Sequence, residues 1–296
     1  MNALYLLKKF CKLINEDGIN TAMDISKQYL SKRYRQLSGE LSTKLSVLYY
    51  KSKYGNASPD PSRLVYIHPK EVNWLISPRF IKPMYQRVNI VGGKWDINYT
   101  DDIIYYTDNG HNTENNSNHK LIPFKNFVFY SSLKKHFIEG YSWEETEIFE
   151  YFLDNNISSY YTTRSAILDR LNELDILYQQ IKEYGYLTQQ EMKSDAPLSS
   201  GTSTKYPELH EVLIHIGRDG TLIFCTGRHR FSIAKILGIK IPVKVHVRHK
   251  QWQGIRNEVG NANSLDELSE TAKSQLDHPD LVDVKEYNSL FNKPTQ

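Results

Sequence analysis

The residues best suited to chemistry stand together at Gly227-Arg228-His229-Arg230, between an apolar run and a segment with helical spacing. A glycine followed by a helix start leaves backbone N–H groups without intrahelical acceptors, and the helix dipole adds positive charge there. Such an end binds anions, and arginine adds a planar fork that matches phosphate oxygens. These four residues, here called the basic box, therefore predict a phosphate-binding turn. The alternative is that Arg228 and Arg230 pair with nearby carboxylates while His229 is a core histidine.

Two glutamates, Glu208 and Glu211, precede the apolar run that leads toward the basic box. A carboxylate beside a bound phosphate can deprotonate a hydroxyl nucleophile or hold magnesium. We expect Glu211 to be the general base and His229 to be a second catalytic residue, with Glu208 as a further substrate or magnesium ligand. The alternative is that both glutamates are exposed to solvent, which is the commoner fate of this residue type.

Other candidate ligands lie near predicted turns and strand ends. Trp95 and Asp96 follow the pair Gly92-Gly93 in VGGKWD. A Gly-Gly turn allows backbone to approach a ligand closely, so Trp95 could stack on a base or sugar and Asp96 could bind substrate or magnesium. Equally, the turn could be an ordinary one with Trp95 in the core. Arg248, at the end of the last predicted strand, could line a substrate entrance or cap the sheet edge.

The elements that must position these residues are read from periodicity and turn signals. Asp219-Gly220 between two apolar runs predicts a hairpin. A short helix should start near Arg230 and end at Gly238, and Pro242 should open a strand with alternating valines. We expect a small mixed sheet with strands near 72–76, 211–217, 221–226 and 242–247, beside a mostly helical segment at 123–192.

The stretch DGTLIFCTGRHRFSIAKILGIKIPVKV resembles the nucleotide-binding core of the ParB/sulfiredoxin superfamily. Members of that superfamily have a strand, a glycine-led basic box, a helix and then a strand opened by "IPV". The box is most similar to the GHHR of free-serine kinases and the GCHR of sulfiredoxins. The resemblance implies an α+β fold, a bound nucleotide (ATP, ADP or CTP) with Mg²⁺, and kinase-like transfer of a phosphoryl group to a small or carbohydrate hydroxyl acceptor. It also places Arg87 near the position of a phosphate-binding arginine.

Departures from the superfamily pattern narrow these implications. Sulfiredoxins need a cysteine where this chain has Arg228, so sulfinic-acid reduction is not expected. Partition proteins carry a helix-turn-helix after the core, and nothing after Trp252 resembles one. DNA is therefore a disfavoured partner, although a nucleotide-gated binding module, a ParB-type CTPase or a nuclease stays open as the alternative.

The resemblance also suggests how the chain is divided. We expect a helical N-terminal region at 1–60, a core made of 61–97 and 205–255, and a mainly helical insertion at 98–204 with a polar loop at 108–119. Residues 256–296 read as a polar C-terminal tail.

Composition and charge argue against a disordered chain and against a protein that binds nucleic acid through a large net charge. The chain has 296 residues with 40% hydrophobic and 24% charged side chains and a net charge of +3, which is typical of a globular protein without a strong field for nucleic acid. Its two distant cysteines favour a reducing compartment, so we expect a cytoplasmic location. The amphipathic N-terminal segment leaves peripheral membrane contact open. The oligomeric state is not fixed by the sequence.

Overall fold

The structure is a computed structural model, which describes residues 44–45, 47–77, 89–105, 120–155, 163–188, 191, 211–288 and 290–291. It comprises two compact units, Met1–Tyr49 and Tyr50–Gln296. The described residues of the first unit are helical, but the segment predicted to touch membranes and the polar loop at 108–119 lie outside the described residues. None of the helices described is both long and apolar enough to cross a bilayer. All that follows concerns the second unit.

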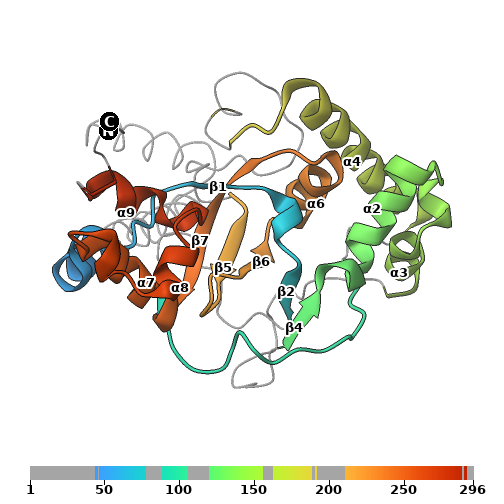
Figure 1. Ribbon diagram of the computed structural model, residues 1–296. Coiled ribbons are helices and arrows are strands. Elements are labelled where there is room, and N and C mark those ends of the chain that lie inside the picture. Colours follow the sequence, from blue (N-terminus) through green and yellow to red (C-terminus); the bar gives the residue numbers. More distant parts are fainter. Residues whose placement is uncertain are drawn as a thin grey trace, which may run out of the picture. The chain divides into compact units, whose positions relative to one another are not determined.

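The second unit is built on a mixed β-sheet flanked by helices, which confirms the predicted α+β class (Figure 1). The strands pair in the order β1-β7-β5-β6-β2-β4, and β3 pairs in parallel with the C-terminal part of β7. The four strands that the sequence predicts are all present, as β2, β5, β6 and β7. The strands are β1 (Val65–Ile67), β2 (Trp74–Ser77), β3 (Asn89–Val91), β4 (Lys120–Pro123), β5 (Leu213–Ile216), β6 (Leu222–Thr226) and β7 (Ile241–His249).

The predicted hairpin joins β5 to β6, which pair antiparallel. Its turn is closed by the Gly217 N–H, which donates to the Thr221 carbonyl at 2.9 Å. Gly220 has a φ of 88°, and a Cβ atom there would lie 2.8 Å from the Trp252 ring. The turn therefore needs glycine both for its backbone conformation and for the close approach of the indole.

The helix after the basic box is α6 (Arg228–Leu237), and it ends at Gly238 as predicted. Phe231, Ile233 and Ala234 are fully buried, so α6 packs its apolar face against the core. β7 follows directly and runs parallel to β5. The order strand, basic box, helix and strand is thus the one that the sequence predicts.

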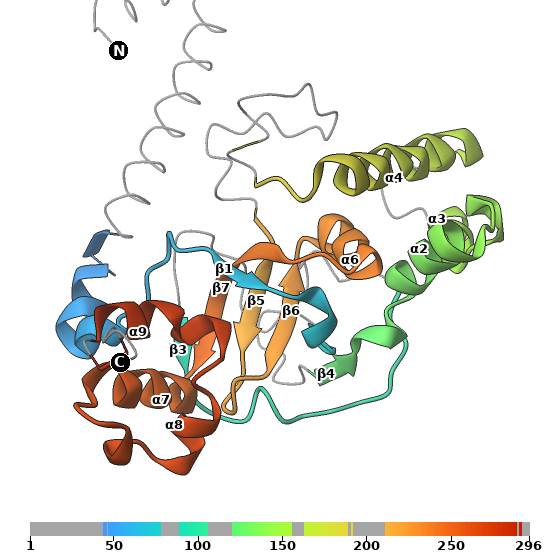
Figure 2. The same cartoon turned by 45° about the horizontal axis from the view of Figure 1, so that its top comes forward.

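Residues 123–192 are largely helical among those described, and they pack beside α6 (Figure 2). A capping box opens the 3-10 turn η4 (Trp143–Glu145), in which the Ser142 N–H donates to Glu145 Oε2 at 2.8 Å. The expected insertion is not only helical, since its strand β4 extends the sheet beside β2. Its elements are η3 (Phe124–Asn126), α2 (Val128–Glu139), η4 (Trp143–Glu145), α3 (Glu147–Asn155) and α4 (Arg164–Tyr184).

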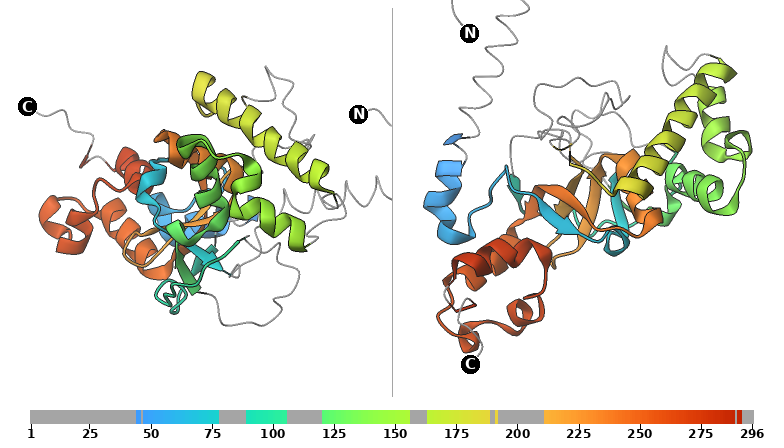
Figure 3. Two further views of the ribbon diagram at one scale, coloured as in Figure 1. Left: turned by 90° about the vertical axis from the view of Figure 1, so that its right-hand side faces the viewer. Right: turned by 90° about the horizontal axis from the view of Figure 1, so that it is seen from above.

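Residues 256–288 are not a polar tail but part of the folded unit. Val259, Ala272, Leu281 and Val284 are buried there, too widely spaced between charged residues to give a clear apolar pattern. These helices gather at the β1 and β7 end of the sheet, opposite to α2–α4 (Figure 3). They are α7 (Lys250–Asn261), η6 (Leu265–Glu267), α8 (Glu270–Ser274), η7 (Pro279–Leu281) and α9 (Val282–Tyr287).

Candidate phosphate-binding site

Gly227 fixes where the basic box lies. Its φ of 95° is in the left-handed region, and a Cβ atom would lie 2.9 Å from Val212 Cγ2 and 3.0 Å from Val212 Cα. Glycine is therefore required on two grounds, and the close approach seats the start of α6 on the residues just before β5. The N-cap residue, Gly227, has no side chain with which to cap this helix start. It therefore cannot supply the acceptor that a Ser, Thr, Asp or Asn cap gives to the first N–H groups.

Arg230 contacts Glu211, the residue predicted to be the general base. Arg230 Nη1 lies 3.3 Å from Glu211 Oε2, and the exposed fractions of the two side chains are 12% and 1%. The Arg230 guanidinium also stacks on the Tyr186 ring, with Cζ 5.3 Å from the ring centroid. The predicted nearness of Glu211 to the basic box is confirmed. Glu211 is also buried, so the alternative that it is exposed to solvent is wrong.

Arg228 and His229 lie against the same aromatic ring of α2. The Phe129 centroid is 5.6 Å from Arg228 Cζ and 5.1 Å from the imidazole centroid of His229. Burial, followed by the charges of Arg228, Arg170 and Arg230, holds the pKa of His229 well below its ordinary value. The imidazole is therefore neutral at pH 7. It can donate or accept a hydrogen bond, but it cannot add a positive charge to the site.

Asp96 and Trp95, the possible ligands of substrate or magnesium, lie at the other end of the β5–β6 hairpin from the basic box. Asp96 Oδ1 is 2.6 Å from Arg218 Nη2 in the turn after β5, whereas Glu211 precedes β5. A four-residue strand spans roughly 13 Å, so the two carboxylates are too distant to act together. Burial would raise the pKa of Asp96, but hydrogen bonds from Arg218 lower it overall. The alternative reading of Trp95 as a core residue is the correct one, since only 2% of it is exposed.

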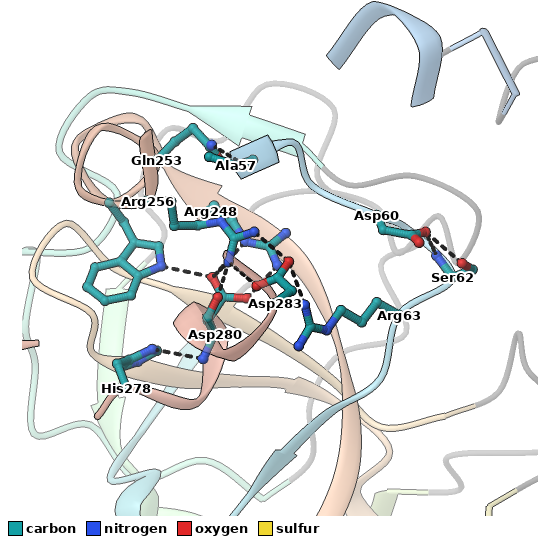
Figure 4. A network of polar contacts seen from close by, with 11 residues as sticks. Ala57, Asp60, Ser62, Arg63, Arg248, Gln253, Arg256, His278, Asp280 and Asp283 are labelled. Atoms are coloured by element: carbon teal, nitrogen blue, oxygen red, sulfur yellow. Dashed lines mark hydrogen bonds and ion pairs between the residues drawn. The ribbon is translucent and has the colours of Figure 1, made fainter. Parts of the chain in front are cut away.

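Arg248 is buried and forms an ion pair with Asp280 of the C-terminal segment, so it does not line a substrate entrance (Figure 4). Its Nη2 lies 2.5 Å from Asp280 Oδ1, and its Nε donates to Asp280 Oδ2 at 2.8 Å. Trp252 Nε1 donates to the same oxygen at 2.9 Å. Arg256 pairs with Asp283 at 2.8 Å beside them. These contacts attach η7 to both β7 and α7, and α9 to α7.

Two predicted site residues, Arg87 and Glu208, lie outside the described residues. Three residues that the sequence did not single out interact with the basic box. They are Phe129 of α2, Arg170 of α4, and Tyr186 just after α4. No motif marks them, and the expected helical segment beside the sheet could not identify individual side chains.

No protein-family model, no curated protein and no solved structure matches this chain. The resemblance to the ParB/sulfiredoxin superfamily therefore stays a prediction. Within the described part of the chain, no group of three or more His, Cys, Asp or Glu side chains is arranged to hold a metal ion.

Proposed function

We propose that this protein binds a nucleotide through its phosphates at the start of α6 and transfers a phosphoryl group to a hydroxyl acceptor. One observation carries the proposal. The N-terminus of α6 has no side-chain cap, is seated by Gly227, and holds Arg228 and Arg230 with the carboxylate of Glu211 3.3 Å from Arg230. Backbone N–H groups and guanidinium groups together are the donors that phosphate oxygens prefer.

Each residue has a distinct role in this reaction. The basic box neutralises and orients the phosphates, because phosphoryl transfer depends mainly on positioning and charge. Glu211 takes the proton of the acceptor hydroxyl while the new P–O bond forms and the bond to the leaving diphosphate breaks. The contact with Arg230 holds the Glu211 carboxylate beside the basic box. The nucleotide would be ATP, ADP or CTP. Only ATP or CTP would leave as a nucleoside diphosphate after transfer.

Magnesium fits this site only with help from the nucleotide. Mg²⁺ is usually held by one or two carboxylates together with phosphates and water, and it neutralises phosphate charge when bound. Glu211 is the carboxylate that contacts the basic box within the described residues, and it already has an arginine partner. A magnesium ion would therefore take most of its ligands from phosphates and water.

The Glu211–Arg230 contact also favours a second candidate function. A carboxylate that stays paired with arginine is a weak base. A site in which Glu211 remains so engaged would bind nucleotide without turnover, as a nucleotide-gated binding module does. Association with DNA, as in ParB-type CTPases, belongs to this alternative.

Nucleotide binding is tested with Arg228→Ala. Isothermal titration with ATP, ADP, CTP and pyrophosphate should give saturable binding to the wild type and at least tenfold weaker binding to the variant. The matched control is Arg164→Ala, because Arg164 pairs with exposed Glu144 on another helix. A second variant, the double substitution Glu211→Gln with Arg230→Gln, removes the buried pair as a unit and so avoids leaving one charge alone. Wild-type protein that binds none of the four ligands would refute the proposal.

Turnover separates the two candidate functions. Wild-type protein with bound ATP or CTP should release phosphate or phosphorylate a hydroxyl acceptor such as serine or a sugar. Binding without any turnover across a panel of acceptors would select the binding module.

A further inference from the structure

Tyr186 places an unsatisfied hydroxyl group beside the candidate site. Gly185 ends α4 with a φ of 81°, and the chain then brings the Tyr186 ring beneath the Arg230 guanidinium. The ring packs against the main core, and its hydroxyl oxygen is buried. No residue of the described chain makes a hydrogen bond to that oxygen. A buried hydroxyl without a partner destabilises the folded protein, so its presence calls for an explanation.

The surroundings of the hydroxyl identify the kind of group that it could meet. Burial raises the pKa of Tyr186 far above its ordinary value; Arg230 opposes this and Glu211 adds to it. The hydroxyl therefore keeps its proton at any neutral pH and is available as a donor. It lies in the electrostatic field of the two residues that define the site, and its missing partner is an acceptor.

We propose that Tyr186 donates a hydrogen bond to a phosphate oxygen of the ligand bound at the start of α6. This inference rests on the proposed function and adds a neutral donor to the charged donors of Arg228 and Arg230. The acceptor is a phosphoryl oxygen because the neighbouring arginine groups already select an anion with several acceptor atoms. The contact also links the end of α4 to ligand binding, a link that no sequence motif indicates.

The same geometry predicts that Tyr186→Phe preserves the stability of the unliganded protein but weakens ligand binding. Phenylalanine keeps the ring that stacks on Arg230 and removes only the hydroxyl. Because that hydroxyl has no hydrogen-bond partner among the described residues, the unliganded variant should be as stable as the wild type or more so. Because a hydrogen bond to a charged ligand is lost, ATP should bind about tenfold more weakly. Pyrophosphate should weaken by the same factor, since the contact is to phosphate and not to the base.

Tyr178→Phe is the matched control. Tyr178 lies on α4 and stacks on Phe137 with ring centroids 4.0 Å apart, a contact that phenylalanine preserves. The dissociation constants of this variant for ATP and pyrophosphate should equal those of the wild type, measured by isothermal titration.

The outcomes separate this inference from the proposed function. Unchanged affinity in Tyr186→Phe with weakened affinity in Arg228→Ala refutes the role of Tyr186 alone. A melting temperature several degrees below that of the wild type also refutes it, because the hydroxyl would then have a structural partner. If the wild type binds neither ATP nor pyrophosphate, both proposals fail together.

Discussion

Replacing Asp280 by asparagine should destabilise this protein more than any single surface substitution. Asp280 is 1% exposed and accepts hydrogen bonds from Arg248 and Trp252, and Arg256 Nη1 lies 3.3 Å from its Oδ2. Asparagine has nearly the same size, but it carries no charge and presents one N–H₂ group where an acceptor is needed. The substitution therefore leaves the buried guanidinium of Arg248 without its counter-charge.

The magnitude follows from burial and geometry. Removing one partner of a buried, hydrogen-bonded ion pair costs about 3–5 kcal/mol, because the remaining charge stays desolvated. Whole domains are stable by only about 5–15 kcal/mol, so the loss is a large share of the total. For a unit of this size each kcal/mol lowers Tm by about 2–4 °C, which predicts a fall of about 6–20 °C. Calorimetry and urea unfolding would measure it.

Asp102→Asn is the matched control. Asp102 lies 3.2 Å from Lys120 Nζ, but 57% of its side chain is exposed. Exposed ion pairs contribute little to stability, so this variant should melt at the same temperature as the wild type. If Asp280→Asn and Asp102→Asn melt at the same temperature, the buried network adds no stability and the predicted loss is wrong.

Acid provides an independent check on the same carboxylate. Burial would raise the pKa of Asp280, but Arg248 and Arg256 hold it far below the ordinary value of 3.8. A carboxylate with a lowered folded-state pKa stabilises the protein above its unfolded pKa, and this stabilisation is lost as pH falls toward the folded pKa. The stability gap between wild type and Asp280→Asn should therefore be constant above about pH 5. It should narrow below pH 3.8 by about 1.4 kcal/mol per unit. A gap that stays constant down to pH 2.5 would contradict the assigned ion pair.

Two further substitutions test the site. Glu211→Gln should keep ATP binding and lose about a hundredfold in phosphoryl transfer, the usual contribution of a general base; Glu144→Gln at an exposed pair is the control, and full activity in Glu211→Gln would place the base elsewhere. Gly227→Ala should cost about 1–2 kcal/mol through the left-handed backbone alone and more through contact with Val212, and it should weaken ATP binding. Gly140→Ala, where φ is 79° but the space is open, should show the backbone cost without the loss of affinity.

The core of the fold could be predicted from the sequence because its signals are local. The Asp219-Gly220 turn, the glycine at each end of α6 and the alternating valines of β7 each determine structure within a few residues. The presence of Glu211 near the basic box followed from strand pairing, since the hairpin returns the chain to the level at which β5 began.

The remaining features depend on contacts between distant residues, which local patterns do not record. Asp280 pairs with Arg248 across 32 positions, so the C-terminal helices looked like a polar tail. Asp96 looked like a ligand because nothing near it in the sequence indicates Arg218, 122 residues away. Tyr186 is one of 21 tyrosines, and its missing hydrogen-bond partner is visible only in three dimensions.

Arginine geometry distinguishes the structural arginines from the one that we propose to bind a ligand. Arg218 and Arg248 each direct two N–H groups at a single carboxylate, and such a fork fixes the guanidinium plane. Arg230 Nη1 lies 3.3 Å from Glu211 Oε2, and its guanidinium stacks on the Tyr186 ring. Arg230 also stands in the first turn of α6, where the helix dipole favours an anion, whereas Arg218 lies in a turn and Arg248 on β7. Its place at a helix start is therefore the reason to propose Arg230, and not the other two, for binding a phosphate.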